Sequence, residues 1–174
     1  MDVKSREEII KFAQKLNSTN LSPLRSGNIS LKAQNNNEAG FLITPSGKKY
    51  DSLKADDIVF VSLEGRYDEK GLQPSSEWRF HKDIYLKKAD AKAVVHAHSP
   101  HATAVSAHNK DIPAFHYMIA LAGGDNIKCA KYATFGTQEL SDNIIEALEN
   151  RKACLTSNHC LLYTSPSPRD LAVS

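Results

Sequence analysis

The sequence has few cysteines, and none of them form a Cys-x-x-Cys pair. Only Cys129, Cys154 and Cys160 occur among 174 residues. An odd, widely spaced set of cysteines is not typical of a small secreted domain held together by disulfides. We therefore expect three free thiols and a fold that depends on an apolar core.

Long apolar runs are also lacking. The longest run has about five residues, whereas a helix that crosses a bilayer needs about 20. The first four residues, Met-Asp-Val-Lys, do not resemble the apolar segment of a signal peptide. The sequence therefore predicts a soluble, cytoplasmic protein with no membrane partner.

Neither sign of charge is in excess. Lys and Arg number 22, Asp and Glu number 20, and the formal net charge is +2. Proteins that bind duplex nucleic acid are usually much more basic, so we do not expect nucleic acid as a partner. A chain of 174 residues with 41% hydrophobic residues is long enough for one domain with its own core.

The N-terminal half contains one helical pattern and several strand patterns. Residues 5–8 (Ser-Arg-Glu-Glu) have capping-box spacing, and apolar residues follow at helical intervals. Residues 29–33 alternate between apolar and polar, residues 35–37 are three asparagines, and residues 41–43 are apolar, which predicts a hairpin. Another strand is predicted at 58–61 and a helix at about 76–88.

The C-terminal half continues the mixture of strands and helices. Residues 93–98 form a short β-branched run that stops at Ser99-Pro100, which predicts a strand followed by a helix. A helix is predicted to start at Thr137, and a strand at 153–155 leads to His159. We therefore expect one α/β domain over residues 1–160.

The last residues do not fit this domain. Residues 161–174 contain two prolines and little apolar surface, so we expect a disordered tail. Their composition is typical of a frame-shifted or adapter-derived translation. We therefore expect the tail to be non-native and the natural C-terminus to be missing.

Three histidines follow predicted strands. His96 and His98 are two residues apart, so a strand directs both imidazoles to the same face. His159 follows a second strand. Three imidazoles with one open coordination position are typical of a catalytic zinc site. An isolated His-x-His pair is more often two ordinary half-buried histidines, and that alternative stays open.

Glu77 lies where a helix is predicted to start. Such a carboxylate can simply stabilise the helix dipole. It can also act as a general base if it lies beside a metal that polarises a carbonyl group. Both interpretations remain open at the level of sequence.

Three clusters of small polar residues are candidates for anion binding. Glycine lets backbone N–H groups approach a phosphate, and hydroxyl and amide groups add hydrogen-bond donors. Each cluster alone is more typical of an ordinary turn. The clusters are Ser26-Gly27-Asn28, Thr44-Pro45-Ser46-Gly47 and Ser75-Ser76.

Five motifs in fixed order resemble the class II aldolase/adducin family, over approximately residues 5 to 160. Within that family, residues 112–118 and 132–140 look most similar to the L-fuculose-phosphate aldolases. The five motifs are residues 26–30 (SGNIS), 42–47 (LITPSG), 74–81 (PSSEWRFH), 94–98 (VVHAH) and 132–137 (YATFGT).

The resemblance implies a fold and an activity. The family fold is an α/β three-layer arrangement around a largely antiparallel central sheet, assembled as a homotetramer with sites at the subunit interfaces. The implied reaction is the cleavage of a ketose 1-phosphate, of the L-fuculose 1-phosphate kind, to dihydroxyacetone phosphate and an aldehyde. The implied cofactor is Zn²⁺, although another divalent metal could replace it.

The resemblance also assigns roles to residues of this chain. His96, His98 and His159 match the zinc ligands, and Glu77 matches the acid/base that also approaches the metal. Tyr117 matches a tyrosine that reaches a neighbouring subunit's site and protonates the aldehyde oxygen. The implied phosphate-binding residues are Ser26, Gly27, Asn28, Ser46, Gly47, Ser75 and Ser76.

One departure and two alternative functions accompany this resemblance. The family normally has glycine after the third histidine, where this chain has Cys160. The same superfamily includes sugar-phosphate epimerases, dehydratases and decarboxylases, as well as non-catalytic domains of the adducin-head type. The presence of all three histidines and of Glu77 argues against the non-catalytic alternative.

Overall fold

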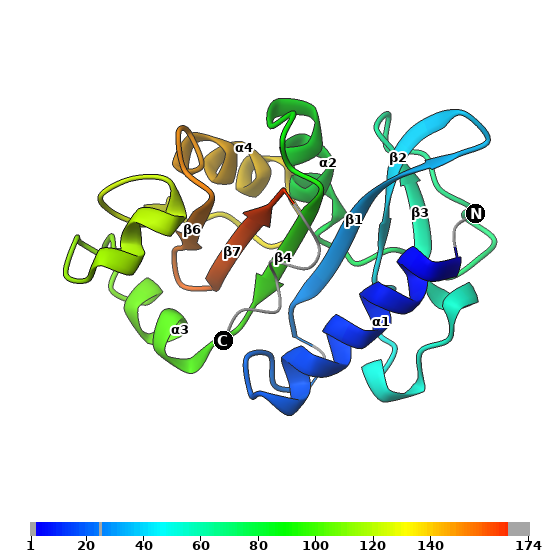
Figure 1. The fold of residues 1–174 in the computed structure, drawn as a ribbon, viewed down its shortest axis with the longest axis horizontal. Helices are drawn as coiled ribbons and strands as arrows, with labels where there is room; N and C mark the ends of the chain where they lie inside the picture. Colours follow the sequence, from blue (N-terminus) through cyan, green and yellow to red (C-terminus); the bar gives the residue numbers. More distant parts are fainter. Residues whose placement is uncertain (1–2, 25, 167–174) are drawn as a thin grey trace.

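A seven-stranded sheet with helices on both faces forms the molecule (Figure 1). The computed structural model describes residues 3–24 and 26–166. The helices are α1 (Val3–Ser18), α2 (Trp78–Lys87), α3 (Pro100–Ser106) and α4 (Gln138–Ala147), with short 3₁₀ helices η1 (Tyr50–Ser52), η2 (Ala55–Asp57) and η3 (Tyr117–Ala122). The strands are β1 (Asn28–Asn35), β2 (Glu38–Ile43), β3 (Val59–Ser62), β4 (Ala93–Ala97), β5 (Lys128–Ala130), β6 (Ala153–Thr156) and β7 (Cys160–Ser165).

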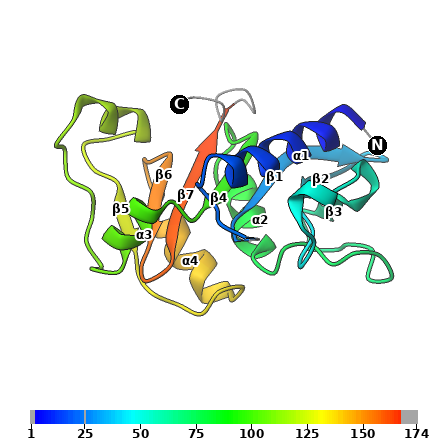
Figure 2. The ribbon, with the colours of Figure 1, turned by 90° about the horizontal axis from the view of Figure 1, so that it is seen from below.

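The sheet is largely antiparallel. Its strand order is β3-β2-β1-β4-β7-β6-β5, and among the described strands only β5 and β6 pair in parallel. Helix α1 covers one face, and α2 and α4 cover the other (Figure 2). The predicted α/β three-layer fold around a largely antiparallel sheet is therefore confirmed.

The predicted hairpin is formed by β1 and β2. Asn36 and Asn37 form the turn with φ values of 47° and 68°, a left-handed conformation that asparagine tolerates well. The first half of β1 differs from the predicted alternation, because Ser30 is buried as completely as Ile29 and Leu31. Helices lie against both faces of the sheet at this point, so side chains on both sides of β1 are covered.

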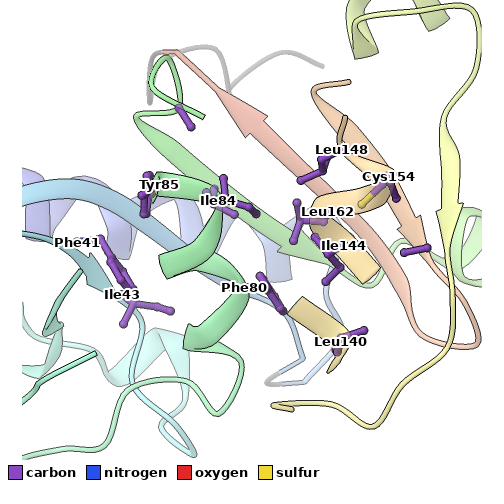
Figure 3. Close-up of a cluster of buried hydrophobic side chains, with 14 of the residues drawn as sticks. Phe41, Ile43, Phe80, Ile84, Tyr85, Leu140, Ile144, Leu148, Cys154 and Leu162 are labelled. Atoms are coloured by element: carbon purple, nitrogen blue, oxygen red, sulfur yellow. The ribbon is translucent and has the colours of Figure 1, made fainter. Parts of the chain in front are cut away.

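Two apolar clusters hold the layers together. The larger one packs Phe41 of β2 and Leu162 of β7 against α2 and α4, as Figure 3 shows. The second lies under α1, where Ile9 and Phe12 contact Ile29 and other residues of the sheet. Each fully buried side chain of this size contributes roughly 1.5–3 kcal/mol of transfer free energy.

The predicted helix starts are partly confirmed. Thr137 caps α4, since its side chain accepts a hydrogen bond from the Leu140 N–H, and Pro100 occupies the first position of α3. Helix α1 differs from the prediction because the chain is already helical at Val3. Ser5 therefore lies inside the helix, and the capping-box spacing at 5–8 does not mark its beginning.

The end of the domain differs from the expected boundary at residue 160. Residues 161–165 were expected to be disordered, but they form most of β7 and pair with β4 and β6. Leu162 and Thr164 are two residues apart, lie on the same face of β7 and are buried. This segment therefore contributes side chains to the core, contrary to the expectation from its composition. Residues 167–174 lie outside the described residues, so that part of the expectation stays a prediction.

None of the helices in the described residues combines the length and the apolar character that a membrane crossing requires.

Candidate metal centre and active site

The three predicted metal ligands meet at the ends of neighbouring strands. His96 belongs to β4, His98 follows that strand by one residue, and His159 lies in the turn between β6 and β7. Because β7 pairs with β4, the turn brings His159 beside the other two. One ligand nitrogen from each histidine lies within 4.8 Å of the others, as a single metal ion requires.

The surroundings of His96 and His98 favour neutral imidazoles. The Nε2 atoms of His96 and His98 are 3.0 Å apart. His96 is completely buried, and burial together with the nearby His159 and His98 holds its pKa well below the usual value. Burial also lowers the pKa of His98. Neutral imidazole is the form that binds a metal.

Glu77 faces the histidines. It is the residue before α2, is only 7% exposed, and places Oε2 3.3 Å from His96 Nε2 and Oε1 3.7 Å from His159 Nε2. Burial raises the pKa of its carboxyl group, an effect that His159 and Asn28 oppose. A carboxylate that only stabilised a helix dipole would lie in solvent with a lowered pKa, so the geometry favours a role in the site.

These donors fit a divalent cation. Among the described residues, the buried Oε1 atom of Glu77 has no hydrogen-bond partner. A buried carboxylate oxygen without a partner is unfavourable unless a proton or a cation satisfies it. Three imidazoles beside it are the donor set that zinc prefers in catalytic sites.

The predicted phosphate-binding residues surround a cavity that adjoins the histidines. Its volume is about 170 Å³, and all seven of the residues line it. Glu77, His98 and His159 line the same cavity. The structure therefore brings the candidate anion donors and the candidate metal ligands to one place.

Gly27 makes this close approach possible. Its φ of +80° is a left-handed conformation, and a Cβ atom there would lie 2.5 Å from the carbonyl oxygen of His96 and 2.5 Å from Ser22 Oγ. Ser22 Oγ also accepts a hydrogen bond from the His98 N–H at 3.2 Å. The loop around Gly27 is thus packed directly against the backbone of the histidine strand.

Sequence reasoning missed three residues that line the cavity. The hydroxyl of buried Tyr50 donates to the Gly27 carbonyl at 2.6 Å and supports that loop. Lys48 brings a positive charge, paired with Asp57 at 2.6 Å, and Phe135 adds an apolar surface. Lys48 directly follows Gly47 and could have been noticed for that reason, whereas no spacing marks Tyr50 or Phe135.

Most of the hydrogen-bonding groups of the Asn28 side chain already have partners within the protein. Its Nδ2 group donates to Glu77 Oε2 at 2.9 Å, and its Oδ1 atom lies 2.5 Å from His81 Nε2. Only the second N–H of the amide is left for a phosphate. The hydroxyl oxygen of Ser75 accepts a hydrogen bond from the Glu77 N–H at 3.4 Å, which leaves its O–H able to donate to a phosphate.

Tyr117 lies apart from this cavity. It belongs to η3, is 79% exposed, and lines a separate surface hollow with Phe115 and His116. Within the described part of one chain, Tyr117 does not line the cavity of the histidines. The predicted role of this tyrosine therefore requires a second copy of the chain and stays a prediction.

Cys160 lies behind the histidine cluster. Its thiol donates to the Ala97 carbonyl at 2.6 Å, and its sulfur is 3.8 Å from His96 Nε2. Burial raises the pKa of this thiol, which keeps it protonated. The cysteine that replaces the expected glycine is accommodated as the buried first residue of β7, next to Ala97 and His96 of β4.

Comparisons with known proteins identify the family of this chain. The family model described as class II aldolase and adducin N-terminal domain matches residues 7–173. The chain is 48% identical over 159 residues to the L-fuculose phosphate aldolase of Escherichia coli, covering 91% of this chain and 72% of that protein. It is 44% identical over 159 residues to the 5-methylthioribulose-1-phosphate/5-deoxyribulose-1-phosphate aldolase of Rhodospirillum rubrum, covering 91% and 70%.

A solved structure of an L-fuculose 1-phosphate aldolase superposes with a TM-score of 0.89 at 35% identity, covering 98% of this chain and 81% of that chain. The family match includes residues beyond 160, in agreement with the strand β7. With the sheet, the histidine cluster and these relatives in agreement, the chain belongs to the class II aldolase and adducin family, as an aldolase and therefore a lyase.

Proposed function

We propose that this aldolase cleaves a ketose 1-phosphate, of the L-fuculose 1-phosphate kind, to dihydroxyacetone phosphate and an aldehyde, with zinc as its metal. The observation that carries the proposal is the single cavity lined by His98 and His159 of the histidine cluster, by Glu77 and by the candidate phosphate donors. The names of the two relatives, a fuculose phosphate aldolase and a ribulose-1-phosphate aldolase, support a ketose 1-phosphate as the substrate class.

The metal and the phosphate have separate places in this proposal. The Nε2 atoms of His96, His98 and His159 would hold the cation, which when bound supplies a Lewis acid for the oxygens of the ketose. The hydroxyl of Ser76 and the backbone of the Gly27 and Gly47 loops bind the phosphate. Binding at both ends fixes the ketose so that its C3–C4 bond lies beside Glu77.

Proton transfer in the proposed reaction needs two groups. When the C3–C4 bond breaks, the hydroxyl on C4 loses its proton and becomes the aldehyde oxygen. The electron pair stays on C3, and the Glu77 carboxyl delivers a proton to that carbon, which becomes the hydroxymethyl carbon of dihydroxyacetone phosphate. Tyr117 from a second copy of the chain exchanges the proton at the aldehyde oxygen.

A panel of substrates tests the proposed function. Zinc-loaded protein is incubated with L-fuculose 1-phosphate, 5-deoxyribulose 1-phosphate, 5-methylthioribulose 1-phosphate and the corresponding unphosphorylated ketoses. We expect dihydroxyacetone phosphate from at least one phosphate ester and little turnover of the free sugars. Epimerised or dehydrated products, or equal turnover of the free sugars, would contradict the proposal.

Phosphate binding is tested by Ser76→Ala. Loss of one hydrogen bond to a charged group should weaken substrate binding by about 1.5–3 kcal/mol, so KM should rise with little change in kcat. Ser76 is exposed at the cavity, so the substitution leaves the core intact. The matched control is Ser52→Ala in η1, outside the cavity. An unchanged KM in Ser76→Ala would remove Ser76 from the phosphate site.

A homotetramer and a cytoplasmic location remain part of the proposal. The support for an assembly is the exposure of large apolar side chains near Tyr117: Phe115 is 74% exposed and Leu121 is 59% exposed. Exposed apolar surface of this kind commonly marks contacts between proteins. The mass of the protein in solution, measured by light scattering, tests the tetramer.

A further inference from the structure

A chain of buried hydrogen bonds leads from the core of the protein to Glu77. The Tyr85 hydroxyl lies 2.8 Å from Ser30 Oγ, which lies 2.6 Å from His81 Nδ1. His81 Nε2 lies 2.5 Å from Asn28 Oδ1, and Asn28 Nδ2 donates to Glu77 Oε2 at 2.9 Å. Tyr85, Ser30, His81 and Asn28 are each at most 3% exposed. Buried polar groups connected in this way fix one another's positions.

The donors and acceptors fit only one consistent direction. Because a carboxylate accepts, the Asn28 amide must turn its Nδ2 group toward Glu77 and its Oδ1 atom toward His81. His81 Nε2 must therefore carry a hydrogen. Burial and the nearby His96 hold the pKa of His81 well below its usual value, so the ring is neutral and Nδ1 accepts from the Ser30 hydroxyl. Ser30 in turn accepts from Tyr85.

Rigid elements set the geometry of this chain. Asn28 and Ser30 are two residues apart in β1 and face the same side of the sheet, while His81 and Tyr85 are four residues apart on one side of α2. The His81 ring stacks on Phe80, with centroids 4.7 Å apart and an interplanar angle of 22°. Phe80 and Tyr85 lie in the buried cluster between α2 and the sheet (Figure 3).

We propose that His81 is a positioning residue for Glu77, which it orients through the Asn28 amide. By holding Oε2 of the carboxylate, the amide leaves Oε1 facing His159 Nε2 at 3.7 Å, without a hydrogen-bond partner among the described residues. The inference rests on the proposed function, because it concerns the residue that delivers the proton to C3. A purely structural histidine would instead affect activity only as far as it affects folding.

Three substitutions of His81 distinguish a positioning role from a purely structural role. His81→Phe keeps a ring between the aromatic neighbours but removes both nitrogens. His81→Gln retains an N–H near the position of Nε2 and can still donate to Asn28. The shorter side chain of His81→Asn can place its amide oxygen near Nδ1, facing Ser30, but does not reach Asn28. We expect kcat to fall by about 10- to 100-fold in His81→Phe and His81→Asn, the usual effect of losing a group that supports a ligand. His81→Gln should keep most of the parent kcat.

The metal content should stay near that of the parent in all three variants, since the imidazoles of the cluster are unchanged. KM should change far less than kcat, since Ser76 and the Gly27 and Gly47 loops are unchanged. Ser141→Ala is the matched control, because it removes a partly buried hydrogen bond of 2.6 Å to Asp83, also on α2, and leaves the hydrogen bonds from Tyr85 to Glu77 unchanged. It should lower stability and leave kcat unchanged. If His81→Gln is as slow as His81→Phe, or if kcat follows stability in every variant, the inference is wrong.

A measurement without substrate keeps this inference distinct from the proposed function. In ¹⁵N NMR spectra of the parent protein at neutral pH, we expect His81 to be the neutral tautomer with hydrogen on Nε2. Its Nε2 resonance should shift in Asn28→Leu and not in Ser141→Ala. A protonated ring or hydrogen on Nδ1 overturns the inference. A parent enzyme that fails on every ketose 1-phosphate contradicts the proposed function, and the NMR result still decides on His81.

Discussion

Glu77→Gln should lower the rate of proton exchange at the hydroxymethyl carbon of dihydroxyacetone phosphate by about 10² to 10⁴, the usual contribution of a general acid or base. The glutamine keeps the size of the side chain and an oxygen that can accept from Asn28 Nδ2. It cannot carry the proton. Because Glu77 already lies against His96 and His159, the substitution removes an ionisable group from the centre of the site.

The measurement is deuterium uptake from D₂O into dihydroxyacetone phosphate without aldehyde, so that bond formation does not limit the rate. Glu139→Gln, an exposed carboxylate in the first turn of α4, is the matched control and should exchange at the parent rate. Near-normal exchange in Glu77→Gln would mean that another group moves the proton.

Thermal stability separates this role from a helix-dipole role. Burial raises the pKa of Glu77 above its unfolded value, so its contribution to the stability of the metal-free protein is present at low pH and is lost as the pH rises through the raised pKa. Glutamine does not ionise, so metal-free Glu77→Gln at pH 7 should unfold no earlier than the parent. A dipole role predicts the opposite, a loss of about 0.3–1 kcal/mol.

His96→Ala should abolish most metal binding. The His96 ring is completely buried, and its Nε2 atom lies 3.0 Å from His98 Nε2 and 3.3 Å from Glu77 Oε2. Two imidazoles are an incomplete set for zinc, so affinity should fall by more than the roughly 10- to 100-fold that follows loss of a merely supporting residue. Metal content after dialysis, measured by mass spectrometry, together with a zinc titration, gives the result.

Two further variants control for folding and for non-specific binding. His98→Ala removes a half-buried ring with less risk to the core and should lose metal in the same way. His108→Ala removes an exposed histidine outside the cluster and should bind metal like the parent. The histidine assignment fails if His96→Ala and His98→Ala retain the parent stoichiometry.

Most of the secondary structure could be predicted because the periodicity of apolar residues and the composition of each segment were clear. Residues 58–61 and 93–98 are short β-branched runs, and each one overlaps a strand of the structure, Val59–Ser62 and Ala93–Ala97. The order of the strands was not predictable, since the pairing of β1 with β4 depends on contacts far apart in sequence. Strand β7 was missed because Leu162 and Thr164 alternate with residues that face away, next to a proline-rich segment.

The sequence predicts those parts of the site in which functional residues have a characteristic spacing. His96 and His98 are recognisable as a pair, but the register that places Asn28 opposite His96 is visible only in the sheet. That register directs the Asn28 amide toward Glu77, which the sequence alone did not indicate. His81 and Tyr50 were overlooked because single residues without a repeat look like ordinary members of a core.

The packing of Gly27 limits how this enzyme can be re-engineered. A Cβ atom at position 27 would lie 2.5 Å from the carbonyl oxygen of His96. Any side chain there would therefore displace the strand that carries His96 as well as the loop that would bind phosphate. Substrate range and metal binding are therefore not independent traits at this position. Ser46 lines the same cavity and is exposed, so it is a better position for a library that alters anion preference.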